Sequence, residues 1–444
     1  MNERTFDANF VKACIVCRNY SMGRMYISLL QEKGSGPNVA TLVKFIQLCY
    51  YCRQQVDKID EVEQFCNQLQ SHSPFLDSNS KESLVLGLSI TSKWKDGLKL
   101  LLEDESIQAN APMNAMIDRL LAEDDLESAT FLMEKAAEKK RTIYDFVHEH
   151  WINKSEKNPH AWDLYSSYIS RNEVFLKEVI AFKLKDMLAR RSFDSYIGQK
   201  TTVADSNGKC RSCNEILQNT SISEEEYSAL KTCLLEKVLQ GPDVFVGSRP
   251  EELTRFREFI NETAPYDVVI DGLNVAYFHG TDSQRNPPKK RMQSLLSVVK
   301  HFNSQGKKVF VLGRDHMRYW SPQLCLFLTE NLSKDDPFLL YAALQSADTK
   351  IVSDDIFRDH LFRLGDSRLA NVFRLWQRSS QLQIIAVGDG LVQIHYPLKH
   401  RTVAQYNNNG CWHIPYDDGV LRFSYQLPTT WLCLQPNDKP INSR

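Results

Sequence analysis

The sequence has 444 residues and a formal net charge of −1, so it is long enough for two or three domains and has no overall positive field that would attract nucleic acid. Hydrophobic residues make up 42% and charged residues 25% of the chain, which is ordinary for a soluble globular protein. No apolar run reaches the roughly 18 residues of a membrane-spanning helix, and no signal or transit peptide is visible at the N-terminus.

Residues 1 to about 195 are predicted to form successive helices, because proline is scarce and apolar residues recur at spacings of three and four. Four segments in this stretch are similar in sequence, and they begin at Tyr20, Ile59, Trp94 and Leu126. Each has a bulky first residue and a small or modest residue three positions later. The steps between them are 39, 35 and 32 residues. A helical hairpin repeated at about this period is typical of an α-solenoid.

The stretch from Asn114 to Lys140 resembles a pentatricopeptide repeat, a family of RNA-reading solenoids. The Trp, Gly and Pro signature of tetratricopeptide repeats, which share this period, is missing. The resemblance implies RNA binding by the helical region. A helical domain that binds protein or no ligand is the alternative that the repeats leave open.

A polar stretch with glycine and serine follows at residues 198–209, which predicts a linker. After it, Ser223 and Glu226 have the spacing of a capping box. This pattern predicts an amphipathic helix that starts near Ser223 and ends near Gly241.

Eleven cysteines in a chain of this length do not indicate a secreted disulfide scaffold; they are expected to be reduced. The pairs Cys14–Cys17 and Cys49–Cys52 lie in apolar helical stretches and are interpreted as buried thiols. The pair Cys210–Cys213 lies in a polar loop, as in a zinc knuckle.

A tetrahedral zinc site at the third pair needs two further ligands. Cys233 lies on the amphipathic helix and is expected in the core, whereas the C-terminal tail offers Cys411, His413 and Cys433. If the tail meets the Cys210–Cys213 loop, the metal joins the two stretches that flank the second half of the chain into one structural module.

From Tyr266 onward, short apolar strands alternate with helical stretches. The predicted strands are Val268–Ile270, Lys308–Leu312, Lys350–Val352 and Gln383–Val387. The predicted helices are Arg291–Asn303, Pro322–Asn331, Pro337–Ala347 and Ser367–Ser379. This order predicts a parallel sheet with helices on both faces.

Aspartates gather where these strands end. Asp271 ends the first strand, Asp354 and Asp355 follow the third, and Asp335 and Asp336 stand where a helix should start. Helix capping is the alternative explanation for the last pair. Because carboxylates that converge on one sheet edge repel one another, they indicate a cation, and hard oxygen ligands suit Mg²⁺ or Mn²⁺. Two such ions can hydrolyse a phosphodiester.

Nucleotide binding is the alternative function for such a sheet. It requires a glycine-rich loop that enters a helix, but Gly272 stands alone after the first strand. The sequence therefore favours metal–carboxylate chemistry at Asp271 over a phosphate cradle, with Gly272 leaving room for a sharp turn and for RNA.

Several motifs together resemble the NYN branch of PIN-like nucleases and, within it, protein-only ribonuclease P of the animal mitochondrial type. They are Val269–Val275, Lys334–Asp336, Leu340–Ala343, Val352–His360, Trp412–Pro415 and Trp431–Cys433. The resemblance implies a multidomain α plus α/β fold. A pentatricopeptide-like solenoid is expected at residues 1–195, a split zinc-binding β module at 196–222 and 404–444, and an NYN metallonuclease with a parallel sheet at 223–403.

Residue by residue, the resemblance implies two sets of ligands. The catalytic and Mg²⁺-binding carboxylates are Asp271, Asp335, Asp336 and Asp355. The structural Zn²⁺ ligands are Cys210, Cys213, His413 and Cys433, with Cys411 a free neighbour.

The implied function is a metal-dependent endoribonuclease that removes the 5′ leader of precursor tRNA with two Mg²⁺ or Mn²⁺ ions. The helical arm would grip the tRNA elbow. A tRNA methyltransferase and a short-chain dehydrogenase are the expected partner subunits, the mitochondrial matrix is the expected compartment, and no membrane is involved. The alternatives are a non-catalytic RNA-binding scaffold with a nuclease-like fold and a PIN-like nuclease that acts on other RNA.

Overall fold

The structure is a computed structural model, and it divides the chain into two compact units. It describes residues 3–34, 36–72, 76–191, 194–204, 208–220, 222–239, 249–280, 285–319, 326–330, 335–355, 357, 364, 367–388, 391–422 and 427–437. The first unit comprises Met1–Val203, Arg211–Cys213 and Thr402–Arg444; the second comprises Ala204–Cys210 and Asn214–Arg401. No helix among these residues has the length and apolar character needed to cross a membrane.

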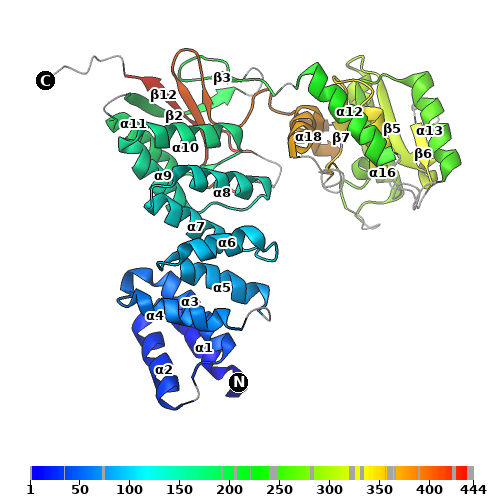
Figure 1. Cartoon of the computed structure of the whole chain (residues 1–444). Helices are drawn as coiled ribbons and strands as arrows, with labels where there is room; N and C mark the ends of the chain where they lie inside the picture. Colours follow the sequence, from blue (N-terminus) through cyan, green and yellow to red (C-terminus); the bar gives the residue numbers. More distant parts are fainter. Residues whose placement is uncertain are drawn as a thin grey trace. The chain divides into compact units, whose positions relative to one another are not determined.

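The first unit begins with paired helices that stack one after another (Figure 1). They are α1 (Glu3–Val16), α2 (Tyr20–Glu32), α3 (Val39–Tyr51), α4 (Ile59–Gln70), α5 (Ser78–Ser89), α6 (Trp94–Glu103), α7 (Asn110–Ala122), α8 (Leu126–Glu138), α9 (Asp145–Lys157), α10 (Pro159–Arg171) and α11 (Glu178–Arg190). The helices α2, α4, α6 and α8 start at the residues that open the four similar segments, which confirms the predicted solenoid.

The small residue three positions after the start of each repeat segment has a packing role. A Cβ atom on Gly97 of α6 would lie 2.5 Å from Cε of Met116 in α7 and 3.0 Å from Cβ of Leu88 in α5. A Cβ on Gly23 of α2 would lie 2.2 Å from Cδ2 of Leu48 in α3. A small residue therefore lets neighbouring helices approach at these positions.

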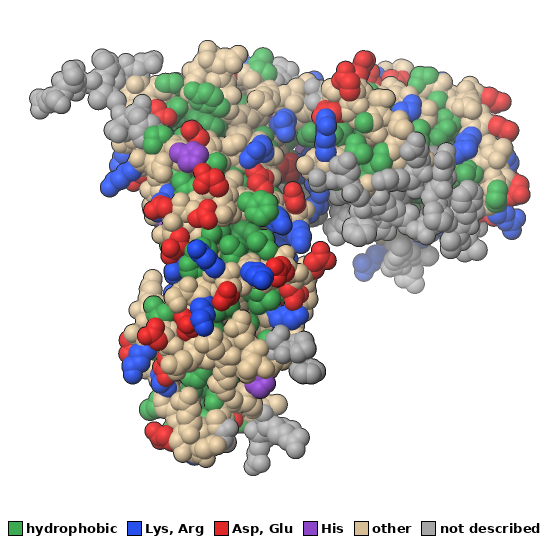
Figure 2. Space-filling model, viewed as in Figure 1, with side chains coloured by type: hydrophobic (Ala, Val, Ile, Leu, Met, Phe, Trp, Pro, Cys, Tyr) green, Lys and Arg blue, Asp and Glu red, His purple; other side chains and the backbone are tan. Residues whose placement is uncertain are grey.

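Ion pairs join side chains about one repeat apart along the stack. They include Arg24 with Glu61, Lys93 with Glu63, Lys154 with Asp124, Arg171 with Glu134, and Lys183 with Glu149. Accordingly, Figure 2 shows Lys and Arg side chains interspersed with Asp and Glu over the visible face of the helices. Exposed pairs of this kind each contribute about 0–1 kcal/mol, so the buried apolar faces of the helices hold the stack.

A β-sheet packs on the last helices of the first unit, and its short strand β3 (Lys209–Cys210) groups with the second unit. The strands of this sheet are β1 (Leu176–Lys177), β2 (Tyr196–Ala204), β3 (Lys209–Cys210), β10 (Gln405–Tyr406), β11 (Trp412–Asp417) and β12 (Thr430–Pro436). The order is β1-β11-β12-β2-β3, and β10 pairs with β11. Trp162 of α10 meets Trp412 edge-on at 5.3 Å between ring centroids. The sheet and helices α6–α11 thus share one core.

The linker predicted at residues 198–209 is wrong where the structure describes it. Residues 198–204 belong to strand β2, which pairs antiparallel with β12 from Tyr196↔Pro436 to Thr430↔Thr202. A Cβ on Gly198 would lie 2.3 Å from Cδ2 of Leu434, so this glycine serves close packing on a neighbouring side chain. Residues 205–207 lie outside the described part.

The second unit is a sheet covered by helices on both faces. Its helices are α12 (Glu224–Leu239), α13 (Pro250–Thr263), α14 (Gly272–Ala276), α15 (Pro288–Asn303), α16 (Asp335–Ala343) and α18 (Ser367–Ser380). Its strands are β4 (Val268–Asp271), β5 (Val309–Arg314), β6 (Leu326–Thr329), β7 (Lys350–Val352), β8 (Gln381–Gly388) and β9 (Leu391–His395). The predicted capping box is confirmed: Glu226 N–H donates to Ser223 Oγ at 3.1 Å, and Ser223 N–H donates to Glu226 Oε2 at 3.1 Å.

Alternate residues of β4 explain the two covered faces. Val268 and Ile270 pack in the cluster that contains Leu295 and Val298 of α15. Val269 points the other way, into the cluster with Phe256 of α13, Phe338 of α16 and Phe373 of α18. Side chains alternate across a strand, so a continuous apolar run is buried on both sides.

The sheet order is β6-β5-β4-β7-β8-β9. All neighbouring pairs are parallel except β8 and β9, which are antiparallel. The predicted parallel sheet is confirmed for the four predicted strands, which correspond to β4, β5, β7 and β8. Strand β9, which was not predicted, adds an antiparallel strand at one edge. The helix predicted at Pro322–Asn331 is also wrong over its described part, because Leu326–Thr329 forms β6 and pairs with β5. Residues 322–325 and 331 of that prediction lie outside the described part.

The strand order and the two chain ends of the second unit both bear on where sites can form. Strand β4 has β5 on one side and β7 on the other, and ligands bind at the carboxyl ends of strands where the order reverses. In addition, the two ends of the second unit lie side by side. Arg401 N–H donates to Gln218 O at 2.8 Å, and Thr220 N–H donates to Lys399 O at 3.1 Å.

Candidate functional site: an aspartate edge and a Cys/His cluster

Asp271 ends β4 and caps the short helix α14. Its Oδ1 accepts the N–H of Asn274 at 2.9 Å, and its Oδ2 accepts the hydroxyl of Ser353 at 3.1 Å. A strand that runs directly into a helix N-terminus turns the carboxylate toward the sheet edge, as predicted from the V-V-I-D-G run.

The surroundings of Asp271 disfavour its charged form. Burial raises its pKa to about 6, against the lowering effect of the Asn274 and Ser353 hydrogen bonds. The negative charges of Asp335 and Asp336 make a smaller contribution to this rise. Asp335 and Asp336 at the start of α16 are therefore close enough to Asp271 to affect its pKa, although they lie more than sixty residues away in sequence.

Asp335 is engaged at both oxygens. Thr329 Oγ1 donates to Oδ1 at 2.9 Å, and Arg314 Nε donates to Oδ2 at 2.9 Å. Burial raises the pKa of Asp335 although both partners favour its charged form, and Asp336 adds a like charge. Asp336 follows it in the first turn of α16. These contacts hold Asp335 between the ends of β5 and β6.

Asp354 and Asp355 follow β7 and are exposed. The N–H of Asp354 donates to Asn274 Oδ1 at 3.2 Å, and the N–H of Asp355 donates to Ser353 Oγ at 3.1 Å. Asp355 Oδ1 also accepts the N–H of Phe357 at 2.7 Å. The turn after β7 is thereby tied to the end of β4. The neighbouring motif residues Arg358, Asp359 and His360 lie outside the described part of the chain.

The four predicted aspartates thus lie around the carboxyl ends of β4, β5 and β7. Within the described ranges, no three of them bring their oxygens within 4.8 Å of one another. A set of carboxylates around Asp271 fits a hard divalent cation, because such an ion compensates both the burial and the like charges that raise the pKa of Asp271.

Gly272 is required by close approach to the neighbouring strand. A Cβ atom there would lie 2.6 Å from the backbone oxygen of Leu312 in β5 and 3.1 Å from Cγ1 of Val311. This contact explains why the residue after Asp271 has no side chain; room for RNA at Gly272 stays a prediction.

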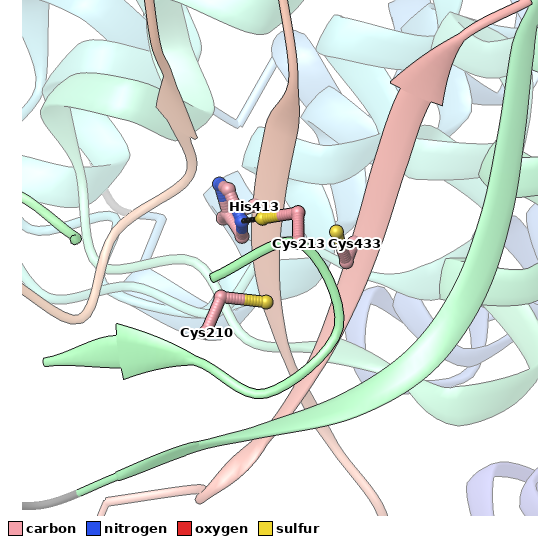
Figure 3. Close-up of side chains that lie close together, drawn as sticks. All are labelled: Cys210, Cys213, His413 and Cys433. Atoms are coloured by element: carbon pink, nitrogen blue, oxygen red, sulfur yellow. Dashed lines mark hydrogen bonds between the residues drawn. The ribbon is translucent and has the colours of Figure 1, made fainter. Parts of the chain in front are cut away.

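The second candidate lies at the sheet that contains β2, β3, β11 and β12. Cys210, Cys213, His413 and Cys433 have ligand atoms that all lie within 4.8 Å of one another. Figure 3 shows these four side chains gathered around a common point, with His413 and Cys213 in contact. The Nε2–Sγ distance of that pair is 3.1 Å.

Backbone pairing explains how distant residues meet in this cluster. His413 of β11 and Cys433 of β12 are paired across the two strands, so their side chains leave the same face. Cys210 ends β3, and Cys213 follows in a turn in which Asn214 N–H donates to Cys210 O at 3.0 Å. Cys411 is buried outside the cluster. A closed set of three thiols and one imidazole fits a tetrahedral metal ion.

Sequence reasoning missed the residues that hold the aspartates. Ser353, Asn274, Thr329 and Arg314 contact them directly, and Gln381 binds the turn that carries Asp355. Asn274 and Ser353 stood inside recognised motifs, but neither was given a role. The others contact partners from separate strands, so no local pattern marks them.

Comparisons with known proteins converge on one group. A family model described as protein-only RNase P matches residues 204–433. The mitochondrial ribonuclease P catalytic subunit of Mus musculus is 30% identical over 445 residues, which cover 94% of this chain and 74% of the mouse protein. The proteinaceous RNase P 1 of Arabidopsis thaliana, chloroplastic/mitochondrial, is 26% identical over 254 residues, covering 54% of this chain and 42% of the plant protein.

Among solved structures, nuclear proteinaceous RNase P 2 from A. thaliana is similar in fold. The TM-score is 0.64 with 16% sequence identity, and the match covers 98% of this chain and 99% of the other.

Proposed function

Because this chain belongs to the protein-only ribonuclease P family, we propose that its aspartate edge binds Mg²⁺ or Mn²⁺ and hydrolyses a phosphodiester of precursor tRNA. The chain is an endoribonuclease of the ribonuclease P type, which removes the 5′ leader of precursor tRNA. Dependence on a metal, the ligand residues and the number of ions are the proposed part.

The observation that carries this proposal is the state of Asp271. Burial and the charges of Asp335 and Asp336 raise its pKa to about 6, although two hydrogen bonds favour the carboxylate. A carboxylate kept buried and beside like charges at the sheet edge supports a site built for a cation. A decayed nuclease used only as a scaffold has no need to keep this arrangement.

Asp271, Asp336 and Asp355 are the proposed direct ligands. A bound Mg²⁺ would supply a Lewis acid and an activated water for attack on phosphate. Ser353 and Asn274 orient the oxygens of Asp271. Asp335 is also a proposed ligand, but both its oxygens accept protein hydrogen bonds. It would bind a metal directly only if the hydrogen bond from Arg314 broke. Otherwise it acts through water or as a general base.

The cluster Cys210, Cys213, His413 and Cys433 is proposed to hold Zn²⁺ as a structural ion. Four protein ligands leave no open position for water. His413 and Cys433 are buried and Cys210 is fully buried, which also argues against catalysis there.

The domain boundaries expected from sequence remain a proposal: solenoid at 1–195, zinc module at 196–222 and 404–444, nuclease at 223–403. We propose that the solenoid binds the tRNA and that a methyltransferase and a dehydrogenase assist as partner subunits. The relatives from mouse and rat are named as mitochondrial, and we propose the mitochondrial matrix as the compartment for this chain.

The test is cleavage of a 5′-labelled precursor tRNA by the full chain in a Mg²⁺ titration, with and without candidate partner subunits. Asp271→Asn is the matched variant. We expect parent cleavage at the 5′ end of the mature tRNA, no cleavage by the variant, and equal precursor binding by both. Normal cleavage by Asp271→Asn would contradict the site. Cleavage of unrelated RNA alone would favour a different nuclease, and binding without any cleavage would favour a scaffold.

A further inference from the structure

The turn that joins β7 to the residues beyond it carries Asp354 and Asp355, and it is held by two side chains that are not carboxylates. Ser353 opens the turn and is 2% exposed. Gln381 begins β8, the strand next to β7, and its Cα is paired with Ile351. Neither residue belongs to the proposed ligand set.

The hydroxyl of Ser353 is used in both directions. It donates to Oδ2 of Asp271 at 3.1 Å and accepts the N–H of Asp355 at 3.1 Å. A serine that accepts the N–H two residues onward is a common turn device. The donation to a carboxylate on another strand is not needed by that turn, and it makes one atom the link between Asp271 and Asp355.

The amide of Gln381 holds the same turn from the other side. Its Nε2 donates to the carbonyl of Ser353 at 2.5 Å and to the carbonyl of Asp355 at 2.8 Å. Its Oε1 accepts Nε2 of Gln377 at 2.8 Å, which fixes which end of the amide faces the turn. Both carbonyls that flank Asp354 are therefore fixed by one side chain.

We propose that Ser353 and Gln381 are positioning residues that set the distance between Asp271 and Asp355 and thereby the affinity of this edge for a divalent cation. They act through the carboxylates and contact neither metal nor RNA. This inference rests on the proposed function, because it concerns the same cation site. Groups that orient metal ligands commonly change affinity by about 10–100-fold when removed.

The competing explanation is a purely structural role, and the sheet offers a matched control for it. Thr349, just before β7, is fully buried, and its hydroxyl donates to Tyr266 O at 2.8 Å. It also joins the β7 segment to the β4 segment, but at the end away from the aspartates. Thr349→Val thus removes a comparable buried hydrogen bond without touching the turn.

The experiment measures Mn²⁺ binding to the full chain by electron paramagnetic resonance, without RNA, together with thermal melting. The variants are Ser353→Ala, Ser353→Thr, Gln381→Met, Thr349→Val and Asp271→Asn. For Ser353→Ala and Gln381→Met we expect a Mn²⁺ Kd about tenfold higher than in the parent. Ser353→Thr keeps the hydroxyl and should stay within about threefold, and Thr349→Val should melt lower but bind Mn²⁺ as the parent does.

Cleavage then gives a second readout. At saturating Mn²⁺ the Ser353→Ala rate should return to within about threefold of the parent, because the ligands themselves are intact. The inference is overturned if Ser353→Ala and Gln381→Met bind Mn²⁺ like the parent, or if Thr349→Val weakens binding equally. Failure of the proposed function looks different: the parent binds no Mn²⁺ or Asp271→Asn binds it equally, and the inference then falls with it.

Discussion

The Sγ atom of Cys213 lies 3.1 Å from Nε2 of His413, although 200 residues separate the two in sequence. His413 is in turn paired across the sheet with Cys433. A contact between such distant segments closes a long loop, so a metal held there would constrain the unfolded chain strongly.

Removing one thiol from this cluster should therefore release the metal. Cys210→Ser is expected to lower the zinc content of the purified chain from about one ion to none and to lower its melting temperature, because structural zinc contributes directly to folding. Elemental analysis and thermal melting measure both effects.

Cys411→Ser is the control for that change. Cys411 is buried and lies two residues before His413 in sequence, but it is not part of the cluster, so its replacement should leave the zinc content unchanged. Equal zinc in Cys210→Ser and the parent would refute the assignment.

A methyl group at Gly272 should disturb the aspartate edge. In Gly272→Ala the new Cβ meets the backbone oxygen of Leu312 at 2.6 Å, and a backbone atom cannot move aside without shifting β5. We expect about 1–3 kcal/mol of destabilisation and a clear loss of precursor cleavage, measured by urea unfolding and single-turnover kinetics.

Gly313→Ala offers the comparison within the same sheet. Its Cβ would meet only side-chain atoms of Leu326, Leu328 and Met317, at 3.2–3.3 Å. These flexible ends can adjust, so the variant should lose little stability. A larger effect at Gly313 than at Gly272 would contradict the role of the β5 contact.

Asp271 should make the metal-free fold less stable at neutral pH. Its pKa is raised from 3.8 to about 6, so the folded state holds this proton more tightly than the unfolded state. The stabilisation is present below about pH 4 and is lost as the pH rises through about 6, with a total near 3 kcal/mol.

Asp271→Asn should consequently unfold at higher urea than the parent at pH 8 without added Mg²⁺, by about 1–3 kcal/mol, and the difference should shrink at pH 4. The same substitution is expected to abolish cleavage, so stability and function should move in opposite directions. A variant less stable than the parent at pH 8 would show that the carboxylate is not under strain.

His148 predicts the opposite pH dependence for the helical arm. It is fully enclosed next to Tyr165, with Nδ1 3.0 Å from the phenol oxygen, and burial lowers its pKa from 6.5 to about 4. Its contribution is complete above about pH 6.5 and is lost as the pH falls through 4, which amounts to about 3 kcal/mol.

The measurement is urea unfolding between pH 7 and 4, with tryptophan fluorescence as the signal. Trp151 reports on this region, since it stacks on Tyr165 with ring centroids 5.8 Å apart. His148→Gln cannot be protonated and should flatten the curve in this range. An unchanged slope in the variant would place the acid sensitivity elsewhere.

Local patterns predicted the elements whose sequences are consistent with a single structure. The V-V-I-D run of β4 has no competing helical period, and the starts of α2, α4, α6 and α8 follow from the repeat. The strand β6 was predicted as a helix because an apolar run of that length fits both, and its pairing with β5 decides between them. β2 was missed because its partner, β12, lies more than 200 residues away.

The site shows the same division. Aspartates at strand ends are visible in sequence, because parallel strands bring their carboxyl ends to one edge. Ser353 and Arg314 have no feature in the sequence that marks a role. Their side chains meet Asp271 and Asp335 only when the sheet brings their strands together. Their roles depend on distances of about 3 Å between separate segments, which no spacing along the chain encodes.

The split sheet of the first unit also sets an order of events during synthesis. Cys210 and Cys213 are made first, and the chain must add the whole second unit before His413 and Cys433 follow. At about 5–20 residues per second this delay is roughly 10–40 s. Meanwhile β2 has no partner from β12, and an unpaired strand invites association with other chains. The hydrogen bonds between residues 218–220 and 399–401 join the two ends of the second unit. Residues 399–401 are made shortly before β11 and β12. The second unit can therefore fold, and bring its two ends together, before these strands are made.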